Sequence, residues 1–543
     1  MATHPEISIF ACPMQNNPPM SQITKSPRTL TILLGIILVL WAMTVYLPAR
    51  HFQFVNWDDY DEVVQNPLLH PASAEHLGNI WSEPYLRLYA PLSYSAWWLI
   101  MQLPDAAGDP GLFHLLNIFL HLSSVALVFS IVRVCVKSPM AAFGGAAIFA
   151  LHPMQVESVA WVSEMNNLLA AALSLAAIRM YLSFRLAGKG RWWKYAIALA
   201  LYLLALFAKP TAVVAPLIAV ILDMGFLRSS VRRVLIAMVP WFCLAGIFAL
   251  VAHQSQTSPG TRWLDRPIIA VDALAFYWGK ILWPLDLTID YGRTPARVLS
   301  GNLWPGNLAI VATLVVILWL LWRTHRGIGL GAMVLLAGVL PVLGFVGFGY
   351  QEYSTVADHF VYLGMLGPSL AGAAILASVP SRWALPLAAA MGVGLAVLCA
   401  KQLKMWRDNG TLVARAMEID PGSSIANDIV GVELNHASQP LLAIPYFSAA
   451  IARDPRNPVF HYNLADAYYW SGQYEKAIGE FETAIPLFHP PSAKAMNNLG
   501  LSYAKAGRTD DAIAEFRGIL AMDPHNADAR YNLQILTGGV PGN

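Results

Sequence analysis

Long apolar runs separated by short polar segments fill the first 400 residues of the chain. A helix that crosses a bilayer needs about 20 predominantly apolar residues, fewer where its flanks extend it. The pattern therefore predicts an all-α fold whose first part is a polytopic bundle of eleven membrane-spanning helices. These helices are expected at residues 29–48, 112–134, 139–152, 156–182, 193–208, 210–226, 233–254, 305–322, 328–349, 358–379 and 383–401.

Two further apolar segments do not fit this set of crossings. Residues 267–285 contain Asp272 and Lys280, and counting them as a crossing breaks the alternation of sides, so we expect an interfacial or re-entrant helix there. Residues 91–103 carry several aromatic side chains, among them Trp97, a composition typical of a helix at the level of the headgroups.

Lys and Arg residues gather in alternate connections between the runs, which sets the orientation through the positive-inside rule. The interpretation places an N-terminal tail, residues 1–28, in the cytoplasm and a first outer loop, residues 49–111, on the far side. With eleven crossings the C-terminus also lies outside. The basic residues expected on the cytoplasmic side are Lys25, Arg28, Arg133, Lys137, those from Arg185 to Lys194 and from Arg228 to Arg233, Arg323, Arg326 and Arg382.

Beyond residue 401 the sequence changes to a charged, Ala-rich pattern that repeats about every 34 residues. Asn463, Asn498 and Asn532 mark the period, and the pattern resembles tetratricopeptide repeats. We expect about three helix pairs, preceded by a half-unit at 411–420 and followed by a capping helix at 527–536. The chain then divides into a membrane domain, 29–405, and a repeat domain, 406–543, whose concave face would grip a peptide or another protein.

Composition agrees with a membrane protein and excludes other classes. Of the 543 residues 56% are hydrophobic and 13% charged, and the mean hydropathy is +0.49. The formal net charge of +2, with scattered basic residues, gives no indication of a nucleic-acid partner. Four cysteines without CxxC spacing indicate neither a disulfide framework nor a zinc site. No small-residue cleavage site follows the first apolar run, so we expect it to be retained.

Four acids within five positions form the most distinctive polar stretch, just after the first predicted crossing. Asp58, Asp59, Asp61 and Glu62 lie between Phe54 and Pro67. Such a stretch is a solvated loop that caps the following helix, a site for a hard cation, or a set of general bases. Residue types alone leave all three interpretations open.

Other charged residues fall near the outer ends of the predicted crossings, where they are costly unless they serve a function. Glu157 and Glu164 are seven positions apart, which on one continuous helix gives them the same face with Glu164 about 10 Å deeper. Asp358 and His359 begin the tenth predicted crossing. The outer cations available to an anionic ligand are Arg87, Lys209, Arg262 and Arg293, and His152 stands at the turn before Glu157.

Several of these motifs occur together in one order along nearly the whole chain. They are Phe-Val-Asn-Trp-Asp-Asp from residue 54, His-Pro-Met-Gln-Val-Glu-Ser-Val-Ala-Trp-Val from 152, Ala-Lys-Pro from 208, Ala-Asp-His-Phe-Val-Tyr-Leu from 357, and Trp-Arg-Asp from 406 leading into the repeats. The combination resembles bacterial relatives of the transmembrane-and-tetratricopeptide O-mannosyltransferases, members of the C-type membrane glycosyltransferase (GT-C) superfamily.

The resemblance implies transfer of a sugar, with inversion, from a polyprenyl-phosphate donor to an acceptor, expected to be a protein hydroxyl, on the periplasmic face of a bacterial inner membrane. The general-base role maps onto Asp58 and Asp59, with Asp58 favoured, and Glu157 would position the acceptor or the sugar. Further substrate contacts would come from Glu164, His152, Lys209, Arg87, Arg293, Asp358 and His359.

The chain departs from the family at two places, because Met165-Asn166-Asn167 and His359 stand where relatives carry basic residues. These changes remove positive charge near a donor phosphate, so another cation has taken over, the donor differs, or the enzyme is weak or inactive. Two rival functions stay open: a non-catalytic scaffold that binds a partner through the repeats, and a glycan polymerase or ligase. No metal or other cofactor is expected, although the acids after residue 57 could hold a cation.

Overall fold

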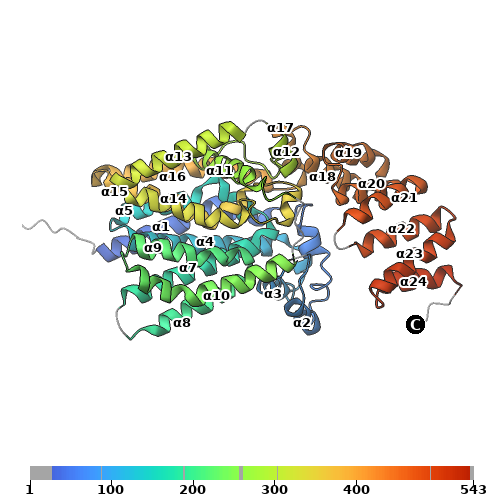
Figure 1. The fold of residues 1–543 in the computed structure, drawn as a ribbon, viewed down its shortest axis with the longest axis horizontal. Coiled ribbons are helices and arrows are strands. Elements are labelled where there is room, and N and C mark those ends of the chain that lie inside the picture. Colours follow the sequence, from blue (N-terminus) through green and yellow to red (C-terminus); the bar gives the residue numbers. More distant parts are fainter. Residues whose placement is uncertain are drawn as a thin grey trace, which may run out of the picture.

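The computed structural model describes residues 27–86, 88–187, 190–255, 261–301, 304–488 and 491–538. Within these ranges the chain forms helices and no strand, apart from an isolated bridge between Tyr85 and Leu88. The predicted all-α class is therefore confirmed. Long helices of the first part run side by side, and the repeat helices extend beyond one end of this bundle (Figure 1).

Each of the eleven predicted crossings coincides with a helix. Six of these helices are long and apolar enough to cross a membrane, and the other five are shorter apolar helices, so the count of eleven crossings stays a prediction. The long helices are α1 (Pro27–Tyr46), α4 (Pro110–Cys135), α7 (Met165–Leu186), α10 (Val231–Ser255), α13 (Trp304–Thr324) and α16 (Ser381–Leu403). The shorter helices are α5 (Pro139–Leu151), α8 (Trp192–Ala208), α9 (Ala215–Gly225), α14 (Arg326–Val339) and α15 (Leu366–Ser378).

The prediction of one continuous helix over 156–182 is wrong. A short helix, α6 (Val156–Ala160), ends where Trp161 takes an extended conformation, and a 3-10 turn over Val162–Glu164 precedes α7. Side chains from elsewhere bind the backbone groups released there: Asn117 donates to the Trp161 carbonyl (2.8 Å), and Asp59 accepts from the Ser163 amide (2.9 Å). These tertiary hydrogen bonds compensate for the helical ones lost at the break.

Other predicted crossings also begin or end in irregular backbone at the same end of the bundle. The tenth starts with two 3-10 turns, Asp358–Val361 and Leu363–Met365, before α15. The ninth ends as an α-helix at Val339, and the sixth opens with a 3-10 turn over Pro210–Val214. Irregular backbone at membrane depth is tolerated where the surrounding protein buries it. At this end of the bundle, non-helical segments therefore form part of the packed interior.

The first outer loop contains a π-helical turn over Tyr60–Val64, α2 (Ala74–Ser82) and α3 (Pro91–Ile100). The helix α3 packs against α8, and its Ser93 Oγ donates to the Ala208 carbonyl (2.9 Å). The second segment that did not fit a crossing forms α11 (Arg266–Leu282), followed by α12 (Pro295–Ser300). Both segments are therefore helices, as the pattern predicts.

Eight helices form the repeat region, and three pairs follow a single helix and precede a last one, as predicted. They are α17 (Asn409–Ile419), α18 (Ser424–His436), α19 (Pro440–Arg453), α20 (Pro458–Trp470), α21 (Tyr474–Ala484), α22 (Ala493–Lys505), α23 (Thr509–Met522) and α24 (Ala527–Leu536). Phe447, Phe481 and Phe516, one in the second helix of each pair, are fully buried and fill the seams.

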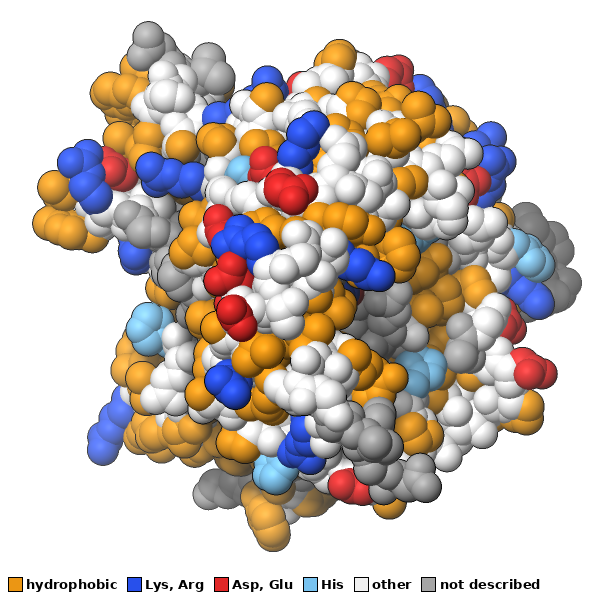
Figure 2. All heavy atoms as spheres, turned by 90° about the vertical axis from the view of Figure 1, so that its right-hand side faces the viewer, with side chains coloured by type: hydrophobic (Ala, Val, Ile, Leu, Met, Phe, Trp, Pro, Cys, Tyr) orange, Lys and Arg blue, Asp and Glu red, His pale blue; other side chains and the backbone are white. Residues whose placement is uncertain are grey.

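Hydrogen bonds join the repeats to the outer loops of the membrane part. The Gln53 amide donates to the Arg407 carbonyl (3.0 Å), and the Asn56 amide donates to Asn409 Oδ1 (2.6 Å). Ser423 Oγ donates to Asp290 Oδ2 (2.7 Å). Acidic and basic side chains lie interspersed among apolar ones when the molecule is viewed from the repeat end (Figure 2). The first loop therefore lies between the bundle and the repeats.

Candidate active site

Asp59 fixes the first outer loop against the helix break. Its Oδ2 accepts a hydrogen bond from the Val55 amide (2.9 Å), and its Oδ1 accepts from both the amide and the hydroxyl of Ser163 (2.9 and 2.7 Å). The side chain is buried. Burial raises the pKa of Asp59 to about 6, and the hydrogen bonds from Ser163 and Val55 oppose that rise. Both carboxylate oxygens are thus occupied by the protein itself.

The neighbouring Asp58 differs sharply from Asp59. Its half-buried carboxylate makes no hydrogen bond or ion pair within the described part of the chain. Burial, followed by the negative charges of Asp59, Asp61 and Glu164, raises the pKa of Asp58 to about 7. Burial and the charge of Asp58 also raise the pKa of Glu62 well above its ordinary value. A carboxylate of this kind can accept a proton near neutral pH.

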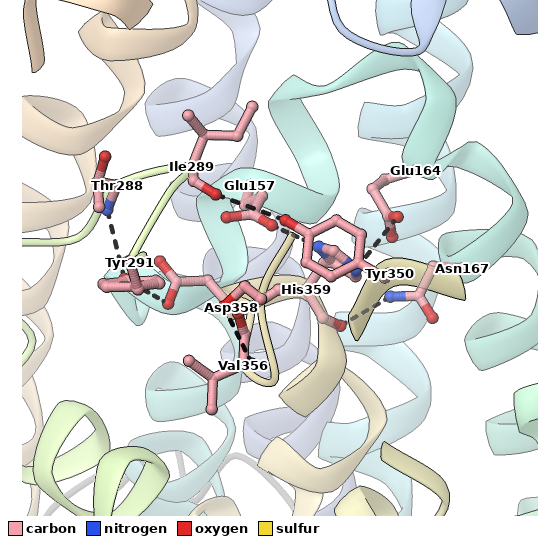
Figure 3. A network of polar contacts seen from close by, with 12 residues as sticks. Glu157, Glu164, Asn167, Thr288, Ile289, Tyr291, Tyr350, Val356, Asp358 and His359 are labelled. Carbon is pink, nitrogen blue, oxygen red and sulfur yellow. Dashed lines mark hydrogen bonds and ion pairs between the residues drawn. The ribbon is translucent and has the colours of Figure 1, made fainter. Parts of the chain in front are cut away.

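His359 links the two glutamates that flank the helix break. Its Nδ1 contacts Glu157 Oε1 in a short hydrogen bond, and its Nε2 lies 3.6 Å from Glu164 Oε1 (Figure 3). Lys209 Nζ lies 3.4 Å from the same Glu164 oxygen. The predicted gathering of Glu157, Glu164 and His359 is therefore present, although the geometry comes from the break and not from a shared face of one helix.

A second layer of polar contacts surrounds this histidine. Tyr291 donates from its hydroxyl to Asp358 Oδ1 (2.8 Å), and Asn167 donates to the His359 carbonyl (2.9 Å). The ring of Tyr350 lies edge-on to that of His359, with 5.5 Å between the ring centroids (Figure 3). Asn167 and Tyr350 thus hold His359 from two sides. The adjacent Asp358 has a different partner, Tyr291.

Lys209 also lines a small pocket, of about 30 Å³, beside this cluster. Asn167, Ser174 and Thr211 contribute polar atoms, and the rest of the lining is apolar. An ammonium group at the edge of such a pocket can meet an anionic group of a ligand. The pocket is formed by α7, the turn after α8, the end of α14 and the start of the tenth predicted crossing.

The remaining predicted site residues have other partners. His152 is buried, contacts the Ile281 carbonyl through Nε2 (3.1 Å), and accepts from the Met154 amide (3.3 Å). Arg293 forms a two-point ion pair with Asp272 (3.0 and 2.6 Å). Arg262 is mostly exposed and pairs with Asp265 (3.0 Å). Arg87 lies outside the described residues.

Some participants were absent from the sequence-based set. Ser163 binds Asp59, Tyr291 binds Asp358, and Tyr350 packs on His359. Tyr291 directly follows Asp290 in a segment that also contains Asp286, and this local cluster of acids was the signal available in the sequence, whereas nothing in the local sequence marks Ser163. Among the described side chains no group of three or more His, Cys, Asp or Glu is placed to hold a metal ion.

Comparison with known proteins adds two results. Tetratricopeptide-repeat family models match residues 434–496 and 497–533, so the repeat region carries such repeats. The second TPR domain of human RPAP3, solved in complex with an HSP70 peptide, is 25% identical and aligns over 21% of this chain and 94% of that domain, with a TM-score of 0.20.

Two fruit-fly proteins resemble a longer part of the chain. One, named protein O-mannosyl-transferase Tmtc1, is 26% identical over 243 residues, which cover 38% of this chain and 28% of that protein. The other, protein O-mannosyl-transferase Tmtc2, is 31% identical over 188 residues, 33% of this chain and 19% of that protein. The chain is therefore similar to these two proteins named O-mannosyl-transferases, and it covers less than a third of the length of each.

Proposed function

We propose that the protein is an inverting glycosyltransferase of the GT-C type, which moves a sugar from a polyprenyl-phosphate donor to a hydroxyl of an acceptor, favoured to be a protein. The similarity to the two fruit-fly O-mannosyl-transferases supports the reaction class. The observation that carries the proposal is the carboxylate of Asp58, which has no hydrogen-bond partner among the described residues, next to the fully bonded carboxylate of Asp59. One acid is held in place by the fold, and the other is left available.

In this reaction Asp58 accepts the proton of the acceptor hydroxyl as its oxygen attacks the anomeric carbon. The bond between that carbon and the phosphate oxygen breaks on the opposite face, and polyprenyl phosphate leaves with the electron pair. Asp59 positions the loop that carries Asp58. A base in this position contributes about 10²–10⁴-fold to the rate.

Charge at the phosphate pole is the second requirement, and Lys209 is the residue best placed to supply it. It lines the pocket beside the cluster, and its partner Glu164 lies at a distance of 3.4 Å. Glu157 and His359 would contact the sugar or the acceptor, and no metal is required because the leaving phosphate needs only compensating charge.

The excess of basic residues in alternate connections supports an inner-membrane protein with its site and repeats on the periplasmic side. The repeats would recruit the acceptor. Their hydrogen bonds with the first loop support this arrangement, since the loop that holds Asp58 also contacts the start of the repeat region at Asn409.

The experiment measures sugar transfer by purified full-length protein from polyprenyl-phosphate mannose, the sugar suggested by the relatives, to periplasmic protein extract. Asp58→Asn should lower the rate at least a hundredfold without lowering the unfolding temperature, because the substitution removes a crowded charge. The matched control is Asp61→Asn, whose residue lies in the same loop but is exposed. Retention of the rate in Asp58→Asn, with transfer present in the wild type, contradicts the proposed base.

A further inference from the structure

A groove of about 590 Å³ lies on the surface of the bundle between α1, α4 and α7. Its lining includes residues near the start of α1, near the end of α4 and in the second half of α7. Arg179 is fifteen residues after Glu164, which corresponds to about 22 Å along the helix axis. The groove is therefore far from the candidate active site, at the end of the bundle predicted to face the cytoplasm.

Arg179 is a cation within a membrane-spanning helix that has no acidic partner in the described chain. Its Nε donates to Ser130 Oγ (2.6 Å), and its Nη1 donates to Ser183 Oγ. Its Nη2 makes no hydrogen bond with any described residue. Arg185, six residues further along the same helix, instead pairs with Asp223 at 2.8 Å. A charged side chain at this depth is costly unless it is paired or serves a ligand.

Arg133 brings a second positive charge into the same groove. Its Nη1 donates to the carbonyls of Val136 (2.7 Å) and Lys137 (2.6 Å) at the end of α4. Its Nε is buried without a hydrogen-bond partner in the described chain. The lining of the groove contains no Asp or Glu. Within the described chain, no acidic side chain therefore neutralises these two guanidinium groups, which have unused donors.

The walls next to these arginines are apolar and open. Ile32, Ile36 and Leu40 of α1 are 56%, 52% and 53% exposed, and Phe129 of α4 completes the lining beside them. A ligand with an anionic head and hydrocarbon chains satisfies both halves of the groove, since its phosphate would meet the arginines and its chains the apolar face of α1. Basic pockets between helices on the cytoplasmic side bind such headgroups.

We propose that this groove binds an anionic phospholipid of the cytoplasmic leaflet, with the lipid phosphate against Arg179 and Arg133 and an acyl chain along α1. The site is separate from the proposed sugar-transfer site in position, leaflet and ligand. It does not depend on that function, because the argument rests on the charges and walls of the groove alone.

The test is native mass spectrometry of the purified full-length protein, exposed to equimolar phosphatidylglycerol and phosphatidylcholine. The wild type should retain phosphatidylglycerol at least fivefold over phosphatidylcholine. Arg179→Gln should abolish that preference, and Arg179→Lys should keep most of it. Arg232→Gln, an exposed arginine at the start of α10 and outside the groove, is the matched control and should change nothing.

Equal retention of both lipids by the wild type, or unchanged preference in Arg179→Gln, overturns the proposal. If Arg179→Gln does not fold, Ile36→Trp carries the test, since it fills the apolar wall without changing charge; retention should fall, and unchanged retention contradicts the lipid pose. Glycerol 3-phosphate, which lacks acyl chains, should not displace phosphatidylglycerol. Displacement would show a site for free phosphate in place of a lipid site.

Discussion

The two ends of α7 hold charge in opposite ways. At its N-terminal end Asp58, Asp59, Glu157 and Glu164 outnumber the nearby cations, and one carboxylate has no partner in the described chain. At its C-terminal end Asp223 is fully matched: Arg185 pairs with it, and the hydroxyls of Tyr181 and Ser229 donate to it at 2.5 Å.

The difference separates a structural ion pair from a candidate reactive group. The Asp223 carboxylate contacts three neighbouring side chains and serves as a structural contact. Among the crowded acids, Asp59 is held in place by two amides and a hydroxyl, and the neighbouring Asp58, whose pKa is raised, can exchange a proton with a substrate. The same helix therefore begins beside a candidate site for chemistry and ends in a stabilising contact.

The largest effect on stability is expected from breaking the ion pair between Asp223 and Arg185. Asp223→Asn should cost about 3–5 kcal/mol of unfolding free energy, because it leaves the charge of Arg185 partly buried without its partner. Tryptophan fluorescence during denaturation measures the loss. The transfer rate per folded molecule should stay unchanged, and a lower rate would show that the two ends are coupled.

The pH dependence of transfer sharpens the outer half of the comparison. The pKa of Asp58 is raised to about 7, so the rate should fall about tenfold for each pH unit below 7 as the proton-accepting carboxylate becomes protonated. A pH profile of transfer between 5 and 8 gives the midpoint. A profile that stays level down to pH 5 contradicts the assignment of Asp58.

The stability of the fold should also depend on the protonation of Asp58 and should decrease as the pH rises. The pKa of Asp58 is higher in the folded protein than its ordinary value of 3.8, so its contribution is present below about pH 4 and is lost as the pH rises through 7. Asp58→Asn should therefore raise the unfolding temperature relative to wild type at pH 8, with the difference vanishing toward pH 4. A constant difference across that range would contradict the raised pKa.

A smaller effect is expected at the hydrogen bonds that hold Asp59. Ser163→Ala removes the hydroxyl donor (2.7 Å) but keeps the backbone donor, and should cost about 1.5–3 kcal/mol because the acceptor is charged. Ser158→Ala is the matched control, since that buried hydroxyl has no hydrogen-bond partner in the described chain. Equal unfolding temperatures of the two variants would show that the fixed state of Asp59 does not depend on this contact.

The smallest effect should come from the joint between loop and repeats. Asn409→Ala removes the acceptor for the Asn56 amide (2.6 Å), at an expected cost of about 0.5–1.5 kcal/mol. Faster amide hydrogen exchange over residues 53–57 should report it, while Ser448→Ala on the outer side of α19 should leave that exchange unchanged. Unaltered exchange in Asn409→Ala would mean that the loop is held by the bundle alone.

Much of the fold could be predicted from the sequence, because apolar length and a fixed repeat period are local signals. Every predicted crossing contains a helix, and tetratricopeptide-repeat models match residues 434–496 and 497–533, within the part where the 34-residue period was seen. The break at Trp161 could not be predicted, since its cause lies in Asn117 and Asp59, which are distant along the chain. Propensity favours continuing that helix, and tertiary hydrogen bonds interrupt it.

The candidate site could be predicted in part for the same reason. The resemblance pointed to Asp58, Glu157 and His359. The fold brings Glu157 and His359 into contact and places His359 near enough to Asp58 to act on its charge. Arg293 was expected at a phosphate, yet Asp272 binds it at two points, and a pairing across twenty-one residues leaves no mark in a motif. The roles assigned to these residues stay predictions until transfer is measured.

The hydrogen bonds from Gln53 and Asn56 to Arg407 and Asn409 attach the helices that lead into the repeats to the loop that holds Asp58. A polypeptide bound by the repeats, as proposed, would then present to Asp58 the segment that lies at a set distance from its bound part. Acceptor hydroxyls would be chosen by their distance along the chain from a docking motif, with little dependence on the residues beside them. The attachment of the repeats to the loop would thereby set the spacing between the docking motif and the modified hydroxyl.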